Sequence, residues 1–511
     1  MKKIYLLFLL LFSSKYFIAQ ETFPINATSN PNHTTYAFTH ATLIVSEEQQ
    51  MQDATLLIKN GRIVATGPNL NVPAGTVVYD LKGKFIYPGL IDMYTTYGIT
   101  EPKRESRPPG PQMLSNIKGA FGWNQAIKAE TDASRLFNAD NKYAEEMRGL
   151  GFGTVLTFQK DGIVRGSAVV VSLADAKENE LILKDRAAAM YSFDKGTSTQ
   201  DYPSSLMGAV ALLRQTYLDA EWYKNDKTKK EFNISLQAFN DLQSIPQIFE
   251  TNNKFNSLRA DKIADEFKVN YILKGSGTEY QRLDDLKASG CRFILPLNFP
   301  AAYDVEDAYD ALNITLTELK HWEMAPVNPF ALEKYFIPFS ITTADLKDKK
   351  DFWKNLRKAI SYGLSEKQAL KALTTVPAEM LQMSDLIGKL KPGMLANFII
   401  TSGNLFDEKT IIYENWIQGK MYRLKDYNLN DIRGTYDLKY GDKQQQLIID
   451  GEMDKPKGKL LVDTTKTPVN ITIAGNSISL SFKLKTREET IRLSGDFSIN
   501  PVQMNGKGQN G

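Results

Sequence analysis

The spacing of apolar and polar positions changes along the chain and divides it into regions. Short apolar runs separated by turns fill residues 36–88, and Asn60-Gly61 between two of them is a strong hairpin signal. From 89 to about 383, strand-like apolar runs alternate with amphipathic stretches, among them 154–158, 205–223 and 271–273. Such alternation is typical of a parallel sheet, and the length suits a closed TIM-like (β/α)8 barrel.

Short apolar runs with strand-like spacing occur again after residue 387. Residues 387–425 read as short strands, and residues 431–499 as a further β-rich C-terminal domain. The last residues, 500–511, are polar and rich in glycine and asparagine, so we expect a flexible tail. The pattern as a whole predicts an α/β protein in which a barrel over 89–383 is flanked by β units.

The amino terminus has the features of a targeting segment. Lys2 and Lys3 precede the apolar run 4–12, and Ala19-Gln20 offers a cleavage point. We predict a signal peptide over 1–19 and an exported, periplasmic mature protein. No other segment approaches the roughly 18 apolar residues that a membrane span needs, so we expect no membrane span.

Composition narrows the classes of partner and chemistry. The chain has 62 basic and 59 acidic residues, and three of the lysines lie in or beside the targeting segment, so there is no basic surface suited to nucleic acid. Cys291 is the single cysteine, which excludes an internal disulfide, and we predict a buried, inert thiol. Only three histidines exist: His33, His40 and His321.

Three separated patches carry a family resemblance. They are Lys-Gly-Lys-Phe-Ile-Tyr-Pro-Gly-Leu-Ile-Asp-Met-Tyr-Thr-Thr-Tyr-Gly at 82–98, the Thr-Val-Pro-Ala helix segment at 369–381, and Gly-Lys-Leu-Lys-Pro-Gly-Met-Leu-Ala-Asn-Phe at 388–398. In this order they resemble the amidohydrolase superfamily, in particular its imidazolonepropionase-like branch. The resemblance implies a barrel, a composite β-sandwich made from 36–88 and 387–425, and Zn or another divalent metal held at the barrel mouth.

The metal ligands that the resemblance implies are missing. At the ends of strands one, five, six and eight, the expected ligand positions hold Tyr94, Thr96, Glu250, Ser276 and Ala344. Only Glu250 is a credible ligand, because tyrosine and threonine hydroxyls are not anionic near neutral pH. His33 and His40 precede the barrel and His321 lies in a segment that looks helical, so none can substitute. We predict a degenerate site with no metal and no other cofactor.

Three carboxylates lie near these positions, namely Asp92, Glu279 and Asp345. Each has a purely structural reading: Asp92 braces the first strand, and Glu279 caps a helix. Asp345 follows Ala344 by one residue, and alternation along a strand turns it to the opposite face. Alternatively, the carboxylates bind a hard cation or perform metal-free acid–base work.

Three functions therefore stay open. The first is an exported, non-hydrolytic binding or assembly module whose pocket holds a small polar or cationic ligand. The second is an active hydrolase of C–N bonds, in non-peptide or cyclic amides, with a carboxylate-based or atypical metal site. The third is a structural partner, either in a homo-oligomer or beside an active relative.

Overall fold

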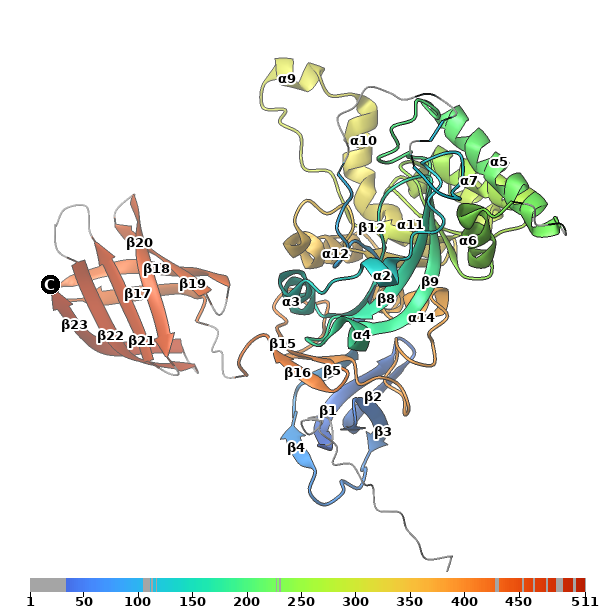
Figure 1. The fold of residues 1–511 in the computed structure, drawn as a ribbon. Helices are drawn as coiled ribbons and strands as arrows, with labels where there is room; N and C mark the ends of the chain where they lie inside the picture. Colours follow the sequence, from blue (N-terminus) through green and yellow to red (C-terminus); the bar gives the residue numbers. More distant parts are fainter. Residues whose placement is uncertain are drawn as a thin grey trace, which may run out of the picture.

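The structure is a computed structural model, and it describes residues 34–103, 111, 114–115, 117–226, 228, 231–427, 432–452, 455–462, 465–474, 477–483, 490–499 and 502–510. The predicted signal peptide lies outside these residues. The strands form three sheets, and the helices lie around the sheet that spans residues 90–342 (Figure 1). Among the described residues, no helix has the length and apolarity to cross a bilayer.

The first sheet joins the two segments predicted to form the composite sandwich. Its strands run in the order β16-β15-β14-β5-β1-β2-β3, with β4 paired to β1, and the antiparallel pair β5–β14 links the segments. The sandwich is therefore built as one continuous hydrogen-bonded sheet around a core that includes Phe38, Phe398 and Trp416. Asn60 and Gly61, both at positive φ, make the predicted hairpin between β2 and β3. The bounds are β1 Tyr36–Ser46, β2 Gln49–Lys59, β3 Arg62–Pro68, β4 Val77–Asp80, β5 Phe85–Pro88, β14 Phe398–Thr401, β15 Ile412–Ile417 and β16 Lys420–Arg423.

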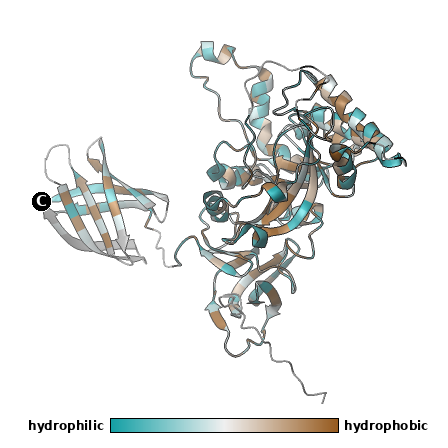
Figure 2. Ribbon diagram, in the orientation of Figure 1, coloured by the Kyte–Doolittle hydropathy of each residue, from teal (hydrophilic) through white to brown (hydrophobic). Residues whose placement is uncertain are grey.

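The central sheet has eight strands in sequence order, and its apolar residues are concentrated along them (Figure 2). The first and last strands, β6 and β13, also contact each other. The carboxyl ends of β6, β7 and β9 to β13 point the same way, so the loops that follow them gather at one edge. The strands are β6 Leu90–Thr95, β7 Phe152–Thr157, β8 Val164–Ser172, β9 Ile182–Ser192, β10 Gln247–Glu250, β11 Tyr271–Lys274, β12 Arg292–Pro296 and β13 Phe339–Thr342.

One strand departs from the predicted parallel arrangement. β8 runs antiparallel to both of its neighbours, β7 and β9. Only residues 158–163 separate β7 from β8, whereas a parallel crossover needs a dozen or more residues. The expectation of a wholly parallel sheet was therefore wrong at this strand. The reversal places the β7–β8 connection at the edge where the carboxyl ends of the other strands lie.

Helices cover the central sheet, and several match the sequence pattern closely. The segment 205–223 forms the long helix α5, and Ser365 caps α13 by accepting the amide of Gln368, as its capping motif predicts. The helices are α2 Ala133–Leu136, α3 Asn141–Gly149, α4 Glu178–Leu181, α5 Leu206–Asn225, α6 Ile234–Leu242, α7 Lys254–Phe267, α8 Leu283–Ala288, α9 Ala308–Leu312, α10 Leu316–Met324, α11 Asn328–Lys334, α12 Phe352–Ser361, α13 Glu366–Leu373 and α14 Thr375–Met380.

The C-terminal region is a seven-stranded antiparallel meander, β17 to β23, with its own small apolar core. Its last strand pairs along its length with β22, so the flexible tail expected for residues 500–511 was wrong for most of that segment. Backbone pairing holds this segment, although most of its residues are polar or glycine. The strands are β17 Gly434–Tyr440, β18 Lys443–Glu452, β19 Lys455–Val462, β20 Thr465–Ala474, β21 Ser477–Lys483, β22 Thr490–Ile499 and β23 Val502–Asn510.

Gly166 allows close packing next to the reversed strand. It has φ +79°, and a Cβ at this position would lie 2.0 Å from the carbonyl oxygen of Thr131. We expect Gly166→Ala to lower the free energy of unfolding by about 3 kcal/mol or more, because backbone atoms must move. Gly83→Ala is the matched control, since Gly83 has φ +76° but no atom within 4 Å of the added Cβ. In urea unfolding, the free energy of unfolding of the control should fall by only about 1 kcal/mol. Equal losses in the two variants would contradict the packing argument.

Candidate functional site

Glu250, at the end of β10, is held by two cations. Its Oε1 lies 2.7 Å from Lys160 Nζ and its Oε2 lies 2.7 Å from Arg165 Nη1. Burial alone raises the pKa of Glu250, but the positive charges of Arg165 and Lys160 outweigh it and lower the pKa to about 2. Glu250 is therefore an ionised carboxylate with both of its oxygens in ion pairs.

Arg165 is the centre of this arrangement. Its side chain is only 3% exposed, its Nε donates to the Gly162 carbonyl at 3.1 Å, and its Nη1 also donates to the Tyr94 hydroxyl at 3.2 Å. Burial raises the pKa of Tyr94 well above its ordinary value, so its hydroxyl stays neutral. Tyr94 and Glu250, two of the predicted positions, are thus joined through a guanidinium.

A second ion pair lies beside the first. Lys274, at the end of β11, contacts the carboxylate of Asp345. The expectation that Asp345 turns away was wrong, because β13 ends at Thr342 and strand alternation no longer applies three residues later. Asp345 instead has a left-handed backbone, with φ +62°.

The two ion pairs meet at the ring of Tyr94. Lys274 Nζ lies 5.6 Å and Lys160 Nζ lies 5.8 Å from the centre of that ring. Glu250 and Lys274 are direct neighbours in the β10–β11 register. We call Tyr94, Lys160, Arg165, Glu250, Lys274 and Asp345 the cation cluster, since three cations outnumber two carboxylates.

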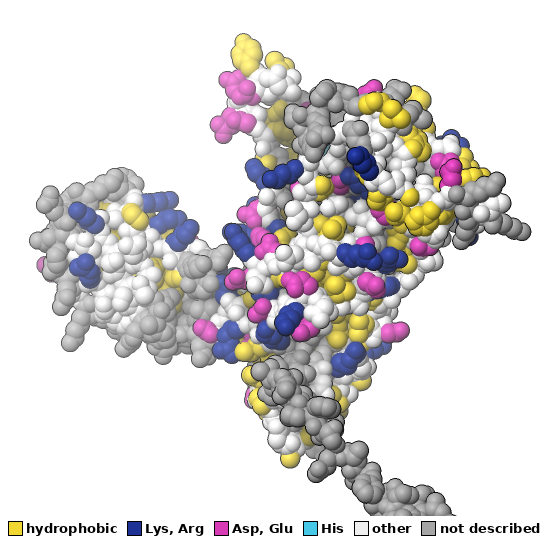
Figure 3. Space-filling model, in the orientation of Figure 1, with side chains coloured by type: hydrophobic (Ala, Val, Ile, Leu, Met, Phe, Trp, Pro, Cys, Tyr) yellow, Lys and Arg dark blue, Asp and Glu magenta, His cyan; other side chains and the backbone are white. Residues whose placement is uncertain are grey.

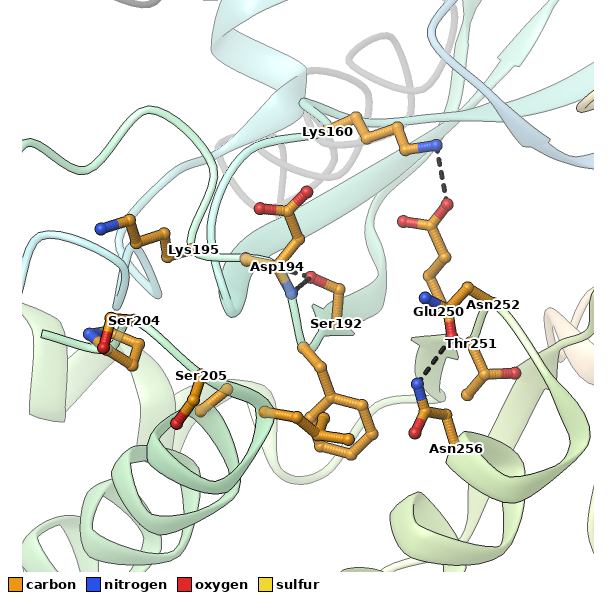
Figure 4. Close-up of a pocket in the computed structure, with 14 residues that line it drawn as sticks. Lys160, Ser192, Asp194, Lys195, Ser204, Ser205, Glu250, Thr251, Asn252 and Asn256 are labelled. Atoms are coloured by element: carbon orange, nitrogen blue, oxygen red, sulfur yellow. Dashed lines mark hydrogen bonds and ion pairs between the residues drawn. The ribbon is translucent and has the colours of Figure 1, made fainter.

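A cavity of about 700 Å³ opens onto this cluster at the ends of β9 and β10. Lys160 and Glu250 form one wall, and Lys195 and Ser205 lie on the opposite side (Figure 4). Phe193 and Leu206 give the cavity an apolar part. The remaining lining residues are Ser192, Asp194, Pro203, Ser204, Ala209, Thr251, Asn252 and Asn256.

Asp92 has a structural role. It is fully buried and accepts the amides of Tyr94 and Thr343, the hydroxyl of Thr342 at 2.6 Å and the hydroxyl of Thr343 at 2.7 Å. Burial raises the pKa of Asp92, while these hydrogen bonds oppose the rise. Its interactions connect the first and last strands of the central sheet, which is the bracing role that the sequence suggested.

Glu279 organises the loop after β11. It is fully buried and accepts the amides of Ser276 at 2.7 Å and Gly277 at 3.0 Å, as well as the side-chain amide of Asn328 at 2.7 Å. Ser276 is thereby held against Glu279, and its hydroxyl lies 2.8 Å from that of Thr278. These contacts form a loop clamp, which replaces the helix-capping role suggested for Glu279.

The remaining predicted residues take part in local structure. Thr96 lies directly after β6 and its carbonyl accepts the amide of Ile99, while the amide of Ala344 donates to Thr342. His321 lies on α10, as expected of a helical segment, with its Nδ1 3.2 Å from the Tyr280 hydroxyl. Cys291 is buried, which raises the pKa of its thiol to about 12, in line with the predicted inert thiol.

The donor set does not fit a divalent metal. Cations engage both oxygens of Glu250, and hydrogen-bond donors engage both oxygens of Asp92 and of Glu279. Three positive side chains around Tyr94 would also repel a divalent cation. Within the described residues, no group of three or more His, Cys, Asp or Glu side chains has the spacing to hold a metal.

The sequence interpretation missed the three cations of the cluster. Lys160 lies in the β7–β8 connection, directly after the carboxyl end of β7, where a parallel or an antiparallel β8 leaves it at the same edge. Arg165, however, interrupts a largely apolar run at 163–171, and Lys274 directly follows the apolar run 271–273; a charged residue is rare in a buried strand unless it is paired. That signal was available in the sequence.

Comparisons with known proteins agree with this fold. The profile of the amidohydrolase family matches residues 328–452. Imidazolonepropionases of Klebsiella pneumoniae strain 342 and of K. pneumoniae subsp. pneumoniae ATCC 700721 are each 24% identical over 365 residues, covering 68% of this chain and 85% of theirs. An amidohydrolase from Thermotoga maritima MSB8 superposes with a TM-score of 0.61 at 22% identity, covering 76% of this chain and all of its own.

The structural neighbour shows the fold, and the family profile and the two relatives add the sequence evidence. Together they support an amidohydrolase superfamily member that is imidazolonepropionase-like.

Proposed function

We propose that this chain has lost metal-dependent hydrolysis and acts as a binding module for a small polar ligand. The observation that carries the proposal is the state of Glu250, the one credible ligand left, whose two oxygens are both taken by Lys160 and Arg165. A metal-activated water is the nucleophile of such hydrolases, and no residue of the cluster replaces it.

Energetics favour the ion pairs over a metal. A divalent cation at Glu250 would have to displace Arg165, whose guanidinium is almost fully buried. An unpaired buried charge of this kind costs about 3–5 kcal/mol. A metal bound through one carboxylate would have to bind strongly enough to offset that cost, and it would also be repelled by Lys160 and Lys274. The cluster is therefore a substitute for the metal's positive charge, without its bound water.

The charges also indicate the kind of ligand. The sequence suggested a polar or cationic molecule, because only carboxylates and hydroxyls were recognised. Asp194 also lines the cavity, so the cluster and the cavity together hold four cations, Lys195 included, and three carboxylates. This excess of one positive charge favours a ligand with one negative charge beside Lys160 or Lys195 and an apolar part against Phe193 and Leu206. The first turn of α5, which contains no acidic residue, adds a favourable dipole.

The alternative hydrolase gains no support from the carboxylates. A general base needs an available lone pair, whereas Asp92 and Glu279 each accept several internal hydrogen bonds and Glu250 is strongly acidic. We further propose that the central sheet is the closed barrel of the family with its third strand reversed. The protein is exported after removal of 1–19 and needs no cofactor.

The ion pairs predict a distinctive acid dependence of stability. Because the pKa of Glu250 is lowered from 4.5 to about 2, its ion pairs stabilise the fold fully above about pH 4.5 and lose this contribution as pH falls through about 2. The shift corresponds to about 3 kcal/mol. Glu250→Gln should therefore be less stable by about that amount at pH 7. The difference in the free energy of unfolding between Glu250→Gln and the wild type, measured by urea unfolding, should become smaller as the pH falls towards 2.

Glu48→Gln is the control for this experiment. Glu48 also pairs with a lysine, Lys367, and its pKa is also lowered, but its side chain is well exposed. Solvent screening makes such pairs nearly neutral for stability. A Glu250→Gln deficit that is the same at every pH would contradict the ion-pair assignment.

Ligand charge can be tested with a matched pair of probes. We expect N-acetyl-leucine, an apolar carboxylate, to bind in isothermal titration calorimetry at least about tenfold more tightly than N-acetyl-leucinamide, because only the acid can pair with a lysine. Lys195→Met should weaken the binding of the acid, whereas Lys82→Met, an exposed lysine beside the first sheet, should not.

Equal binding of the two probes would show that the charge of the cluster does not select the ligand. No binding of either would count against a small apolar carboxylate in this cavity. The acid-stability experiment would still report on the ion pairs themselves, so the two parts of the proposal can fail separately.

A further inference from the structure

Both ends of one connection line the cavity. The connection runs from the end of β9 to the start of α5, over residues 193–205, and we call it the wall loop. Its lining residues are Phe193, Asp194 and Lys195 at the beginning and Pro203, Ser204 and Ser205 at the end. Figure 4 shows Lys195, Ser204 and Ser205 across the cavity from Glu250. The conformation of the wall loop therefore sets the shape of the cavity and the position of Lys195.

The middle of the wall loop has little apolar material of its own. Residues 194–201 read Asp-Lys-Gly-Thr-Ser-Thr-Gln-Asp, without an apolar side chain. Loops of this composition are usually exposed and open easily. Here, however, Gln200 is only 1% exposed and Ser198 only 7% exposed. Polar side chains that are buried in this way need internal hydrogen bonds, and two anchors supply them.

The first anchor is a reciprocal pair of glutamines, which we call the glutamine clamp. The amide of Gln125 donates to Gln200 Oε1 at 2.7 Å, and Gln200 Nε2 donates to the carbonyl of Trp123 at 3.0 Å. In return, Gln125 Oε1 accepts the amide and the hydroxyl of Thr199, each at 3.0 Å. Lys195 Nζ donates to the Gln200 carbonyl at 2.8 Å, so the clamp also holds the ammonium group. Neither glutamine is among the residues that line the cavity.

The second anchor is Asp161, which is 3% exposed and directly follows Lys160. Its carboxylate accepts the amide of Thr197 at 2.6 Å and the hydroxyl of Thr197 at 2.7 Å, and it contacts Lys128 Nζ. Gly196 permits this close approach, because a Cβ at this position would lie 2.0 Å from Asp161 Oδ1. The connection that carries Lys160 on one side of the cavity thus also holds the wall loop on the other side.

The distribution of surface charge makes the position of this loop important. On the face that Figure 3 shows, Lys and Arg side chains are interspersed with Asp and Glu over the part of the molecule that carries the helices. A mixed surface of this kind does not concentrate anions at one place. Selection of an anion therefore depends on where the walls of the cavity hold their few charges.

We propose that Gln125, Gln200 and Asp161 are positioning residues that hold the wall loop in its ligand-binding conformation before a ligand arrives. This inference rests on the proposed function of the cavity as a binding site. A loop that must be ordered on binding reduces the affinity, whereas a loop that is already held does not. The three residues act through the wall loop, since none of them lines the cavity.

A clamp variant, Gln125→Ala with Gln200→Ala, tests the first anchor and leaves the cavity lining in place. Hydrogen exchange over residues 194–203, followed by mass spectrometry, should become at least about tenfold faster than in the wild type, because local opening of the loop becomes easier. Exchange in β10 and β11 should stay the same. Gln215→Ala with Gln237→Ala is the matched control, since both glutamines bond only to exposed carboxylates on their own helices. The control should leave exchange over 194–203 unchanged.

Two substitutions of Thr197 test the second anchor. Thr197→Val removes the hydroxyl that donates to Asp161, whereas Thr197→Ser keeps it. Only the valine variant should speed hydrogen exchange over 194–203. Equal exchange in the two variants would contradict the role of this hydroxyl in holding the loop.

Binding of N-acetyl-leucine separates positioning from a merely structural role. The clamp variant should bind this probe at least about threefold more weakly than the wild type, and the bound probe should restore slow exchange over 194–203, because the ligand must then order the loop. A lower melting temperature without faster exchange of the wall loop would overturn the inference, as would faster exchange with unchanged affinity. If the wild type does not bind the probe, the proposed ligand fails. Faster exchange confined to 194–203 in the clamp variant would then still support the anchoring of the loop, and unchanged exchange would overturn it.

Discussion

The site depends on one buried charge, the guanidinium of Arg165. It contacts Tyr94 and Glu250 at once, and its burial means that it must remain paired. The surrounding structure satisfies that requirement with the Gly162 carbonyl and with the Glu250 carboxylate, which Lys160 also contacts. In the function we propose, the same requirement opposes a divalent metal, since the carboxylate that would ligate the metal is the partner that Arg165 needs.

The reversed strand β8 explains why this charge is in place. Arg165 lies near its start, directly after the short connection that carries Lys160. A parallel strand at this position would present its amino-terminal residues at the opposite edge of the sheet. The reversed direction of β8 therefore brings Arg165 to the same edge as Lys160, and Gly166 lets Thr131 pack closely against the strand.

Much of the architecture follows from residue pattern. The order of strands, the helix α5 and the Asn60-Gly61 hairpin were predictable, because periodicity and turn chemistry are local properties. The direction of β8, the strand formed by the polar residues 502–510 and the position of Asp345 were harder. They depend on loop length, on backbone pairing and on where a strand ends, and apolar periodicity reports none of these.

The sequence predicted which metal ligands are missing from the site, but it did not predict the cationic residues that join the remaining positions. Tyr94 and Glu250 lie together as the family alignment implies, yet the residues that join them come from apolar stretches that a search for metal ligands passes over. Asp92 and Glu279 have structural roles because their oxygens are filled from within the fold. A charged residue inside a buried run is thus as informative at a degenerate site as a missing histidine.

The central claim is that a guanidinium has replaced the metal. The most direct measurement is elemental analysis of the chain, purified without chelators and without a histidine tag, together with Arg165→Met and Glu250→Ala. The account predicts near-zero Zn, Mn, Fe, Ni, Co, Mg and Ca in the wild type and in both variants. A stoichiometric metal in the wild type that is lost on Glu250→Ala would contradict it.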